Sequence, residues 1–222
     1  NAGLNVGGTI SDRTDLTLNN QAGELFSDAN LYAGNKLAIS NSGTNLNITG
    51  GGYTKGINKL DIVNNGTGNT NIAGELVSDD IDIVNNQNAG NLSIYGNIGS
   101  QNSASTRIMN RGEKALVDAN VVSRDVLISN KSSDGLTVSG TVNGETVNIN
   151  NTNGNLTISG DVRNYGNASD TITIYNTGDK LALASNGQIN ASGKLAIKNT
   201  GIDGITLDGT IVNTGSETAI NN

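Results

Sequence analysis

A short motif recurs along the whole chain, and its spacing constrains the fold more than any other feature. The motif is apolar-x-apolar-x-Asn, as in Leu60-Asp-Ile62-Val-Asn64. Its ten copies end at Asn20, Asn41, Asn64, Asn85, Asn110, Asn130, Asn151, Asn176, Asn199 and Asn222. Successive copies lie 20 to 25 residues apart, with a mean near 22. A fixed period of this length indicates an array of stacked structural units.

A second motif, apolar-x-apolar-x-Gly-x-apolar, follows many copies of the first. Examples begin at Leu92, Leu136, Leu156 and Ile205. Both motifs alternate apolar and polar residues, as half-buried strands do. The residues between them are mostly Asn, Gly, Thr, Asp and Ser, which favour turns. Each repeat is therefore predicted to contain two or three short strands.

A period near 22 with several short strands is typical of one coil of a parallel β-helix. Coils would stack at strand spacing, roughly 4.8 Å, so ten of them predict a rod about 45–50 Å long. The six-residue step of left-handed helices and the calcium-binding nonapeptide are absent from the sequence, and leucine-rich repeats need a longer consensus. We therefore predict an all-β, right-handed parallel β-helix over residues 1–222 as a single solenoid. The pattern is interrupted at both ends of the sequence, so we interpret it as part of a longer chain.

The composition narrows the classes of function. The chain has no His and no Cys, which excludes His-based triads, His-ligated metal sites and thiolate chemistry, and we expect no cofactor. A net charge of −7 argues against nucleic-acid binding. The sequence contains no 18-residue apolar run, so we expect no direct insertion into a membrane. Aromatic residues make up only 3% of the chain, so Leu, Ile and Val must form the core.

The repeated Asn lies two residues after an inward apolar position. Side chains alternate between the two faces of a strand, so the Asn side chain also points inward. The ten Asn residues would then form an internal ladder in which each amide bonds to the next coil. We interpret this ladder as structural.

Paired carboxylates are the main candidates for catalysis. Asp61 and Asp82 share a repeat position, Arg107 follows in the same column, and Asp80 lies nearby. Some β-helical polysaccharide lyases and hydrolases use acidic residues on one outer face. However, the sequence has no long loops to wall a groove and no aromatic cluster to stack on sugar rings. We therefore predict a solvated face and no enzyme; in the carbohydrate-active alternative, Asp61, Asp80 and Asp82 would be the carboxylates.

Basic residues are concentrated in one stretch of the sequence. They are Arg107, Arg111, Lys114, Arg124 and Lys131. Arg111 and Lys131 share a repeat position, which predicts a local positive strip. We expect nearby Glu113, Asp118 and Asp125 to balance this strip; the alternative is a contact site for a polyanion, with Arg107, Arg111 and Lys131 as contact residues.

Two other features are candidate contact sites. Val63, Val84 and Met109 fall in one outward column and predict a small apolar ridge. The two longest repeats carry extra residues around Gly99–Ser105 and Asn164–Asp170, with Tyr165 in the second. Insertions in a solenoid form surface loops, often on a binding face.

The repeats resemble those of the filamentous haemagglutinin class of two-partner secretion exoproteins. Their Asn-rich, Cys-free composition is most similar to that of leukotoxin-type filamentous adhesins of anaerobic bacteria. The resemblance implies export through an outer-membrane transporter, a secreted or cell-surface location, and a role in adhesion or toxicity through a host-cell receptor or glycan. We expect a monomeric shaft segment. The motifs of the family's N-terminal secretion domain are not found in the sequence, and an autotransporter passenger is an alternative.

Overall fold

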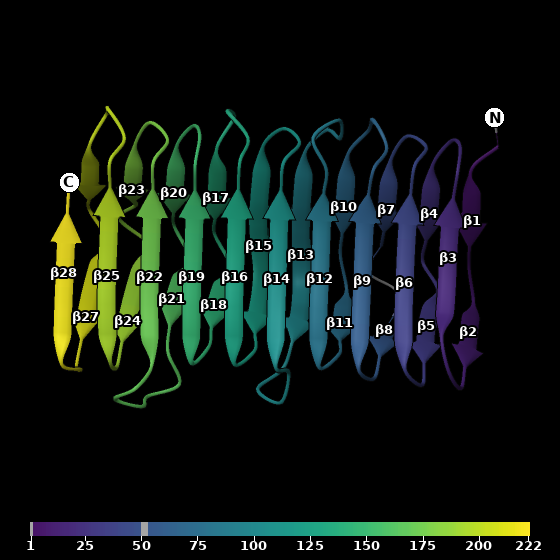
Figure 1. Ribbon diagram of the computed structural model, residues 1–222, viewed down its shortest axis with the longest axis horizontal. Coiled ribbons are helices and arrows are strands. Elements are labelled where there is room, and N and C mark those ends of the chain that lie inside the picture. Colours follow the sequence, from purple (N-terminus) through teal and green to yellow (C-terminus); the bar gives the residue numbers. More distant parts are fainter. Residues whose placement is uncertain (1, 50–52) are drawn as a thin grey trace.

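The computed structural model describes residues 2–49 and 53–222, and every regular element among them is a β-strand. All strand pairs are parallel. Each coil rises through a front strand, crosses to the back and descends there, while the chain advances steadily along one axis (Figure 1). This path is right-handed. The predicted right-handed parallel β-helix of about ten coils is therefore confirmed.

Each coil contributes one strand to a ten-stranded sheet and the equivalent of two strands to an 18-stranded sheet. The ten-stranded sheet consists of β3 (Leu16–Asn20), β6 (Lys36–Asn41), β9 (Lys59–Asn64), β12 (Asp80–Asn85), β14 (Ser105–Asn110), β16 (Asp125–Asn130), β19 (Thr146–Asn151), β22 (Thr171–Asn176), β25 (Lys194–Asn199) and β28 (Glu217–Asn221).

The 18-stranded sheet has two columns. The first column consists of β1 (Leu4–Val6), β4 (Leu25–Ser27), β7 (Leu46–Ile48), β10 (Thr70–Ile72), β17 (Leu136–Val138), β20 (Leu156–Ile158), β23 (Leu181–Leu183) and β26 (Ile205–Leu207). The second consists of β2 (Thr9–Asp12), β5 (Asn30–Ala33), β8 (Tyr53–Gly56), β11 (Glu75–Val77), β18 (Thr141–Asn143), β21 (Asp161–Arg163), β24 (Gln188–Ala191) and β27 (Thr210–Asn213). Two longer strands, β13 (Leu92–Gly99) and β15 (Ala115–Val122), span both columns.

The ten-stranded sheet keeps one register although the repeats differ in length. Asn64 pairs with Asn85 and Asn85 with Asn110, across separations of 21 and 25 residues. Residues 100–104 and 164–170, between strands, take up the longest insertions, and they form the two largest loops along the lower edge of the rod (Figure 1). Turns therefore absorb length differences while the strands stay in phase.

A continuous apolar core fills the interior of the solenoid. Strands alternate buried and partly exposed residues, as in β19 and β22. The buried set is made of Leu, Ile, Val and Ala, with Leu60, Ile83 and Ile149 fully shielded from solvent. Aliphatic and β-branched side chains suit this pleated surface. Among the described residues, no helix is long and apolar enough to cross a membrane.

The glycine of the second motif lies where the chain turns between the two columns of the 18-stranded sheet. A Cβ at Gly160 would stand 1.9 Å from the carbonyl oxygen of Gly140, and one at Gly140 would stand 2.2 Å from that of Ala119. The backbones of successive coils approach too closely here for a side chain in this direction. The motif therefore encodes a tight bend.

Candidate functional site

An unbroken amide ladder runs inside the solenoid at the end of the ten-stranded sheet. The Nδ2 atom of each Asn donates to the Oδ1 atom of the next, over distances from 2.7 to 3.4 Å. The nine bonds join Asn20, Asn41, Asn64, Asn85, Asn110, Asn130, Asn151, Asn176, Asn199 and Asn222. All but Asn222 are buried. Because every amide from Asn41 to Asn199 both donates and accepts, the burial of these polar groups is compensated.

Eight of the ten ladder Asn residues also donate to a carbonyl of the turn that follows their strand. The Nδ2 atom of Asn130 donates to the carbonyl of Ser132 at 3.1 Å, and that of Asn151 donates to the carbonyl of Gly154 at 2.9 Å. Both hydrogens of these amides are thus engaged, one along the rod and one across the turn. The two carbonyls also accept from backbone N–H groups, Ser132 from Gly135 and Gly154 from Asp179, so the amide adds a second bond at each turn.

Thr70 completes the ladder at its longest step. The direct distance from Asn64 Nδ2 to Asn85 Oδ1 is 3.4 Å. The buried hydroxyl of Thr70 accepts from Asn64 Nδ2 at 2.8 Å and donates to Asn85 Oδ1 at 2.7 Å. Its neighbours in the column are Leu46 and Leu92, so a hydroxyl replaces an aliphatic side chain where it can relay the bond. The motif gave no signal for this residue.

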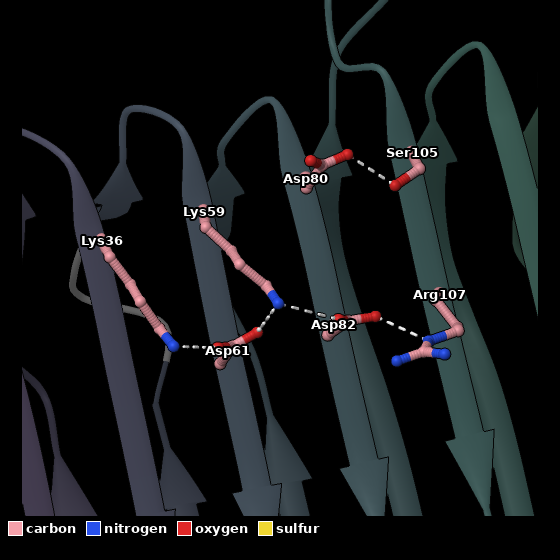
Figure 2. A network of polar contacts seen from close by, with 7 residues as sticks. All are labelled: Lys36, Lys59, Asp61, Asp80, Asp82, Ser105 and Arg107. Carbon is pink, nitrogen blue, oxygen red and sulfur yellow. Dashed lines mark hydrogen bonds and ion pairs between the residues drawn. The ribbon is translucent and has the colours of Figure 1, made fainter.

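A charged network lies on the outer face of the ten-stranded sheet, where the sequence placed its candidate carboxylates (Figure 2). Asp61 accepts from Lys36 at 2.7 Å and from Lys59 at 3.2 Å. Asp82 is 3.5 Å from Lys59 and accepts from Arg107 Nε at 2.7 Å. Cations and anions therefore alternate along the rod, and Lys59 bridges two carboxylates that would otherwise repel.

The pKa of Lys59 is raised, first by its hydrogen bond to Asp61 and the attraction of that carboxylate, and further by Asp82, against the opposing effect of desolvation. Beside this network, Ser105 Oγ donates to Asp80 Oδ1 at 2.7 Å. Asp61 lies beside Lys36 and Lys59, and Asp82 lies beside Lys59 and Arg107, so each carboxylate of this network faces two cations.

Next to this network the sheet is hollowed into a shallow, open depression of about 490 Å³. Arg107 and Asp82 form one side of it, and Asp125, Leu127 and Asn148 lie across it. The depression combines charged, amide and apolar groups. It lies on the face where the carboxylates stack.

Arg111 and Lys131 share their position in adjacent coils, as the repeat predicts, and Arg107 lies apart from them. Arg107 lies within the sheet and is paired with Asp82, whereas Arg111 and Lys131 follow the ladder Asn in the turns of adjacent coils. Glu113, Asp118 and Asp125, which we expected to balance the strip, take part in no ion pair within residues 2–49 and 53–222. Proximity in sequence is a poor guide here, since the neighbours in space lie one coil away.

The apolar column and Tyr165 of the second insertion are both partly buried. Val63, Val84 and Met109 pair in register on β9, β12 and β14, and each is partly exposed. Tyr165 is also partly buried, and its hydroxyl has no hydrogen-bond partner in the described structure. Burial, together with the charges of Glu145 and Asp170, raises the pKa of this phenol. Neither feature forms a deep site.

In comparisons with known proteins, the chain matches no family model, no curated protein and no solved structure.

Proposed function

We propose that this chain is a non-catalytic shaft segment of a secreted or surface-exposed bacterial exoprotein, and that it holds adhesive or toxic parts of that protein away from the cell. The single observation that supports the proposal most is the amide ladder, which is continuous through nine coil-to-coil steps. A solenoid with an unbroken internal ladder is a stiff spacer, because each coil is bonded to both of its neighbours.

The resemblance of the repeats to two-partner secretion exoproteins supports the finer part of the proposal. In such a protein, the segment would pass through an outer-membrane transporter during export and then stand between the cell and a host surface. The absence of Cys from the sequence suits folding after export without disulfide formation.

The experiment that tests location is an immunoblot with antibody raised against residues 1–222. We expect signal in the surface fraction or the culture supernatant of the source organism, in a band much larger than the 22.7 kDa of this chain. Protease treatment of intact cells should remove the surface signal while a cytosolic marker is retained. A band of 22.7 kDa that stays inside intact cells would contradict the proposal.

The carbohydrate-active alternative is tested separately. We expect no reducing ends and no unsaturated products when the chain is incubated with a panel of acidic and neutral polysaccharides. If products do form, the variants Asp61→Asn and Asp82→Asn decide whether the stacked carboxylates are responsible. Turnover that is lost in either variant would show that the chain is an enzyme and would contradict the proposal of a non-catalytic shaft.

A further inference from the structure

A second, strongly polar hollow lies away from the carboxylate face, at the turns that leave β9, β12 and β14. Its volume is about 390 Å³, and it is lined by Asn65, Asn86, Gln87, Asn88 and Arg111. Each of these side chains offers N–H donors. Among the described residues that line it, none carries a carboxylate or an apolar side chain. The hollow therefore presents donors and a positive charge on a protein whose net charge is −7.

One outer amide, that of Asn86, contacts the guanidinium of Arg111, and Asn65 in turn bonds to Asn86. Asn86 Nδ2 donates to Asn65 Oδ1 at 2.5 Å, and Arg111 Nη1 donates to Asn86 Oδ1 at 3.4 Å. A guanidinium has five N–H donors, so this contact leaves most of them for a ligand. Arg111 is exposed, and within residues 2–49 and 53–222 it makes no ion pair, not even with Glu113 two residues on.

The next coil adds a second positive charge. Lys131 occupies the same turn position as Arg111, and it too makes no ion pair in the described part of the chain. Coils lie roughly 4.8 Å apart, so the two cations are close enough to act on one anionic chain that follows the rod.

We propose that this hollow binds the carboxylate of an acidic saccharide, with Arg111 as its main ligand and Lys131 in support. A planar guanidinium matches a carboxylate with two parallel hydrogen bonds. The surrounding amides both donate and accept, as sugar hydroxyls do. The wall carries no apolar side chain, which disfavours an apolar peptide or a lipid tail. This inference goes beyond a shaft role, because a rod with an intact ladder does not require the hollow to bind anything.

The test uses the whole chain and calorimetric titration with an oligogalacturonate and its methyl-esterified form, which keeps the sugars and removes the charges. We expect binding of the free acid only. Arg111→Gln should weaken that binding at least tenfold, or about 1.4 kcal/mol, and Lys131→Gln should weaken it by less. The matched control is Arg124→Gln, which makes the same charge change on another exposed arginine and should stay within twofold.

Thermal melts of all three variants check for a folding defect. We expect none, because Arg111 and Lys131 lie on the surface. The proposal is overturned if the unmodified chain binds no free acid, if the esterified form binds as well, or if Arg124→Gln costs as much as Arg111→Gln. Equal binding of poly-glutamate would overturn the assignment to a saccharide.

Discussion

Asn130 offers the sharpest test of the internal ladder, because it is fully buried in the middle of the rod. Replacing it with Ala removes three hydrogen bonds. They are those from Asn110 Nδ2 at 2.8 Å, to Asn151 Oδ1 at 2.7 Å and to the carbonyl of Ser132 at 3.1 Å. The truncation leaves three polar groups in the interior without these partners.

The expected loss of unfolding free energy follows from the polar groups that lose these partners. A buried donor or acceptor left unsatisfied costs about 1–3 kcal/mol. Three such groups give about 3–9 kcal/mol; we expect a value near 4 kcal/mol, because the Asn110 amide keeps its bond to the carbonyl of Glu113 and the Ser132 carbonyl still accepts from the Gly135 N–H. The matched control is Asn222→Ala at the exposed end of the ladder, which loses only the bond from Asn199 and should cost below about 1 kcal/mol.

Urea unfolding followed by circular dichroism measures both variants, and hydrogen exchange by mass spectrometry locates the loss. We expect Asn130→Ala to lose protection first in the strands on either side, β14 and β19. Asn130→Leu nearly keeps the shape but can neither donate nor accept, so it separates lost hydrogen bonds from a cavity and should also destabilise. If Asn130→Ala stays within 1 kcal/mol of the unmodified chain, or matches Asn222→Ala, the ladder does not stabilise the rod.

Three further predictions concern the relay, the titratable groups and the charged face. Thr70→Val keeps the shape of the side chain and removes the relay, so urea unfolding should show a loss of about 1–3 kcal/mol, whereas Thr157→Val on the outer face should stay within about 0.5 kcal/mol. With no His or Cys, the unfolding free energy should be flat between about pH 5 and 9. The pKa of Lys59 is raised in the fold, so its favourable contribution is complete below the ordinary value of 10.5 and is lost as pH rises through the folded pKa. The pKa of Asp12 is lowered by hydrogen bonds from Thr14, so its contribution is present above 3.8 and is lost as pH falls through the folded pKa. Urea midpoints measured over a pH series check the expected losses of stability at high and at low pH. Lys59→Met should reduce the loss at high pH. Asp82→Asn should cost below about 1 kcal/mol, less in high salt, and a larger loss would show that the charged face is structural.

The coil architecture could be predicted from the sequence because the apolar alternation, the repeated Asn, the Gly of the second motif and the insertions all indicate the same strands and turns. The two apolar residues and the Asn of each first motif fall on one side of a strand, and period-2 alternation then assigns both faces. The Gly of the second motif marks the bend, and the insertions occur where turns were expected. A one-residue slip would expose the whole apolar set, so the register is strongly specified.

The side-chain contacts could not be predicted in the same way. The relay at Thr70 depends on the fit of one hydroxyl between two amides, which no periodicity encodes. The bridging of Asp61 and Asp82 depends on the reach of Lys59 across two coils. The balance of basic residues by Glu113 was expected from nearness in the sequence, whereas contacts in a solenoid join residues about 20–25 positions apart.

Removal of whole coils tests the central claim, that this chain is a modular rod, most directly. Deleting residues 131–176 removes two repeats and joins Asn130 to Thr177, which restores the same position in the coil. Small-angle scattering should then show a folded particle shorter by about 10 Å, at roughly 4.8 Å per coil. Deleting residues 131–165 removes a non-integral number of coils and should prevent folding. If the first variant unfolds, or if both variants fold equally well, the account of a stacked, ladder-bonded shaft is contradicted.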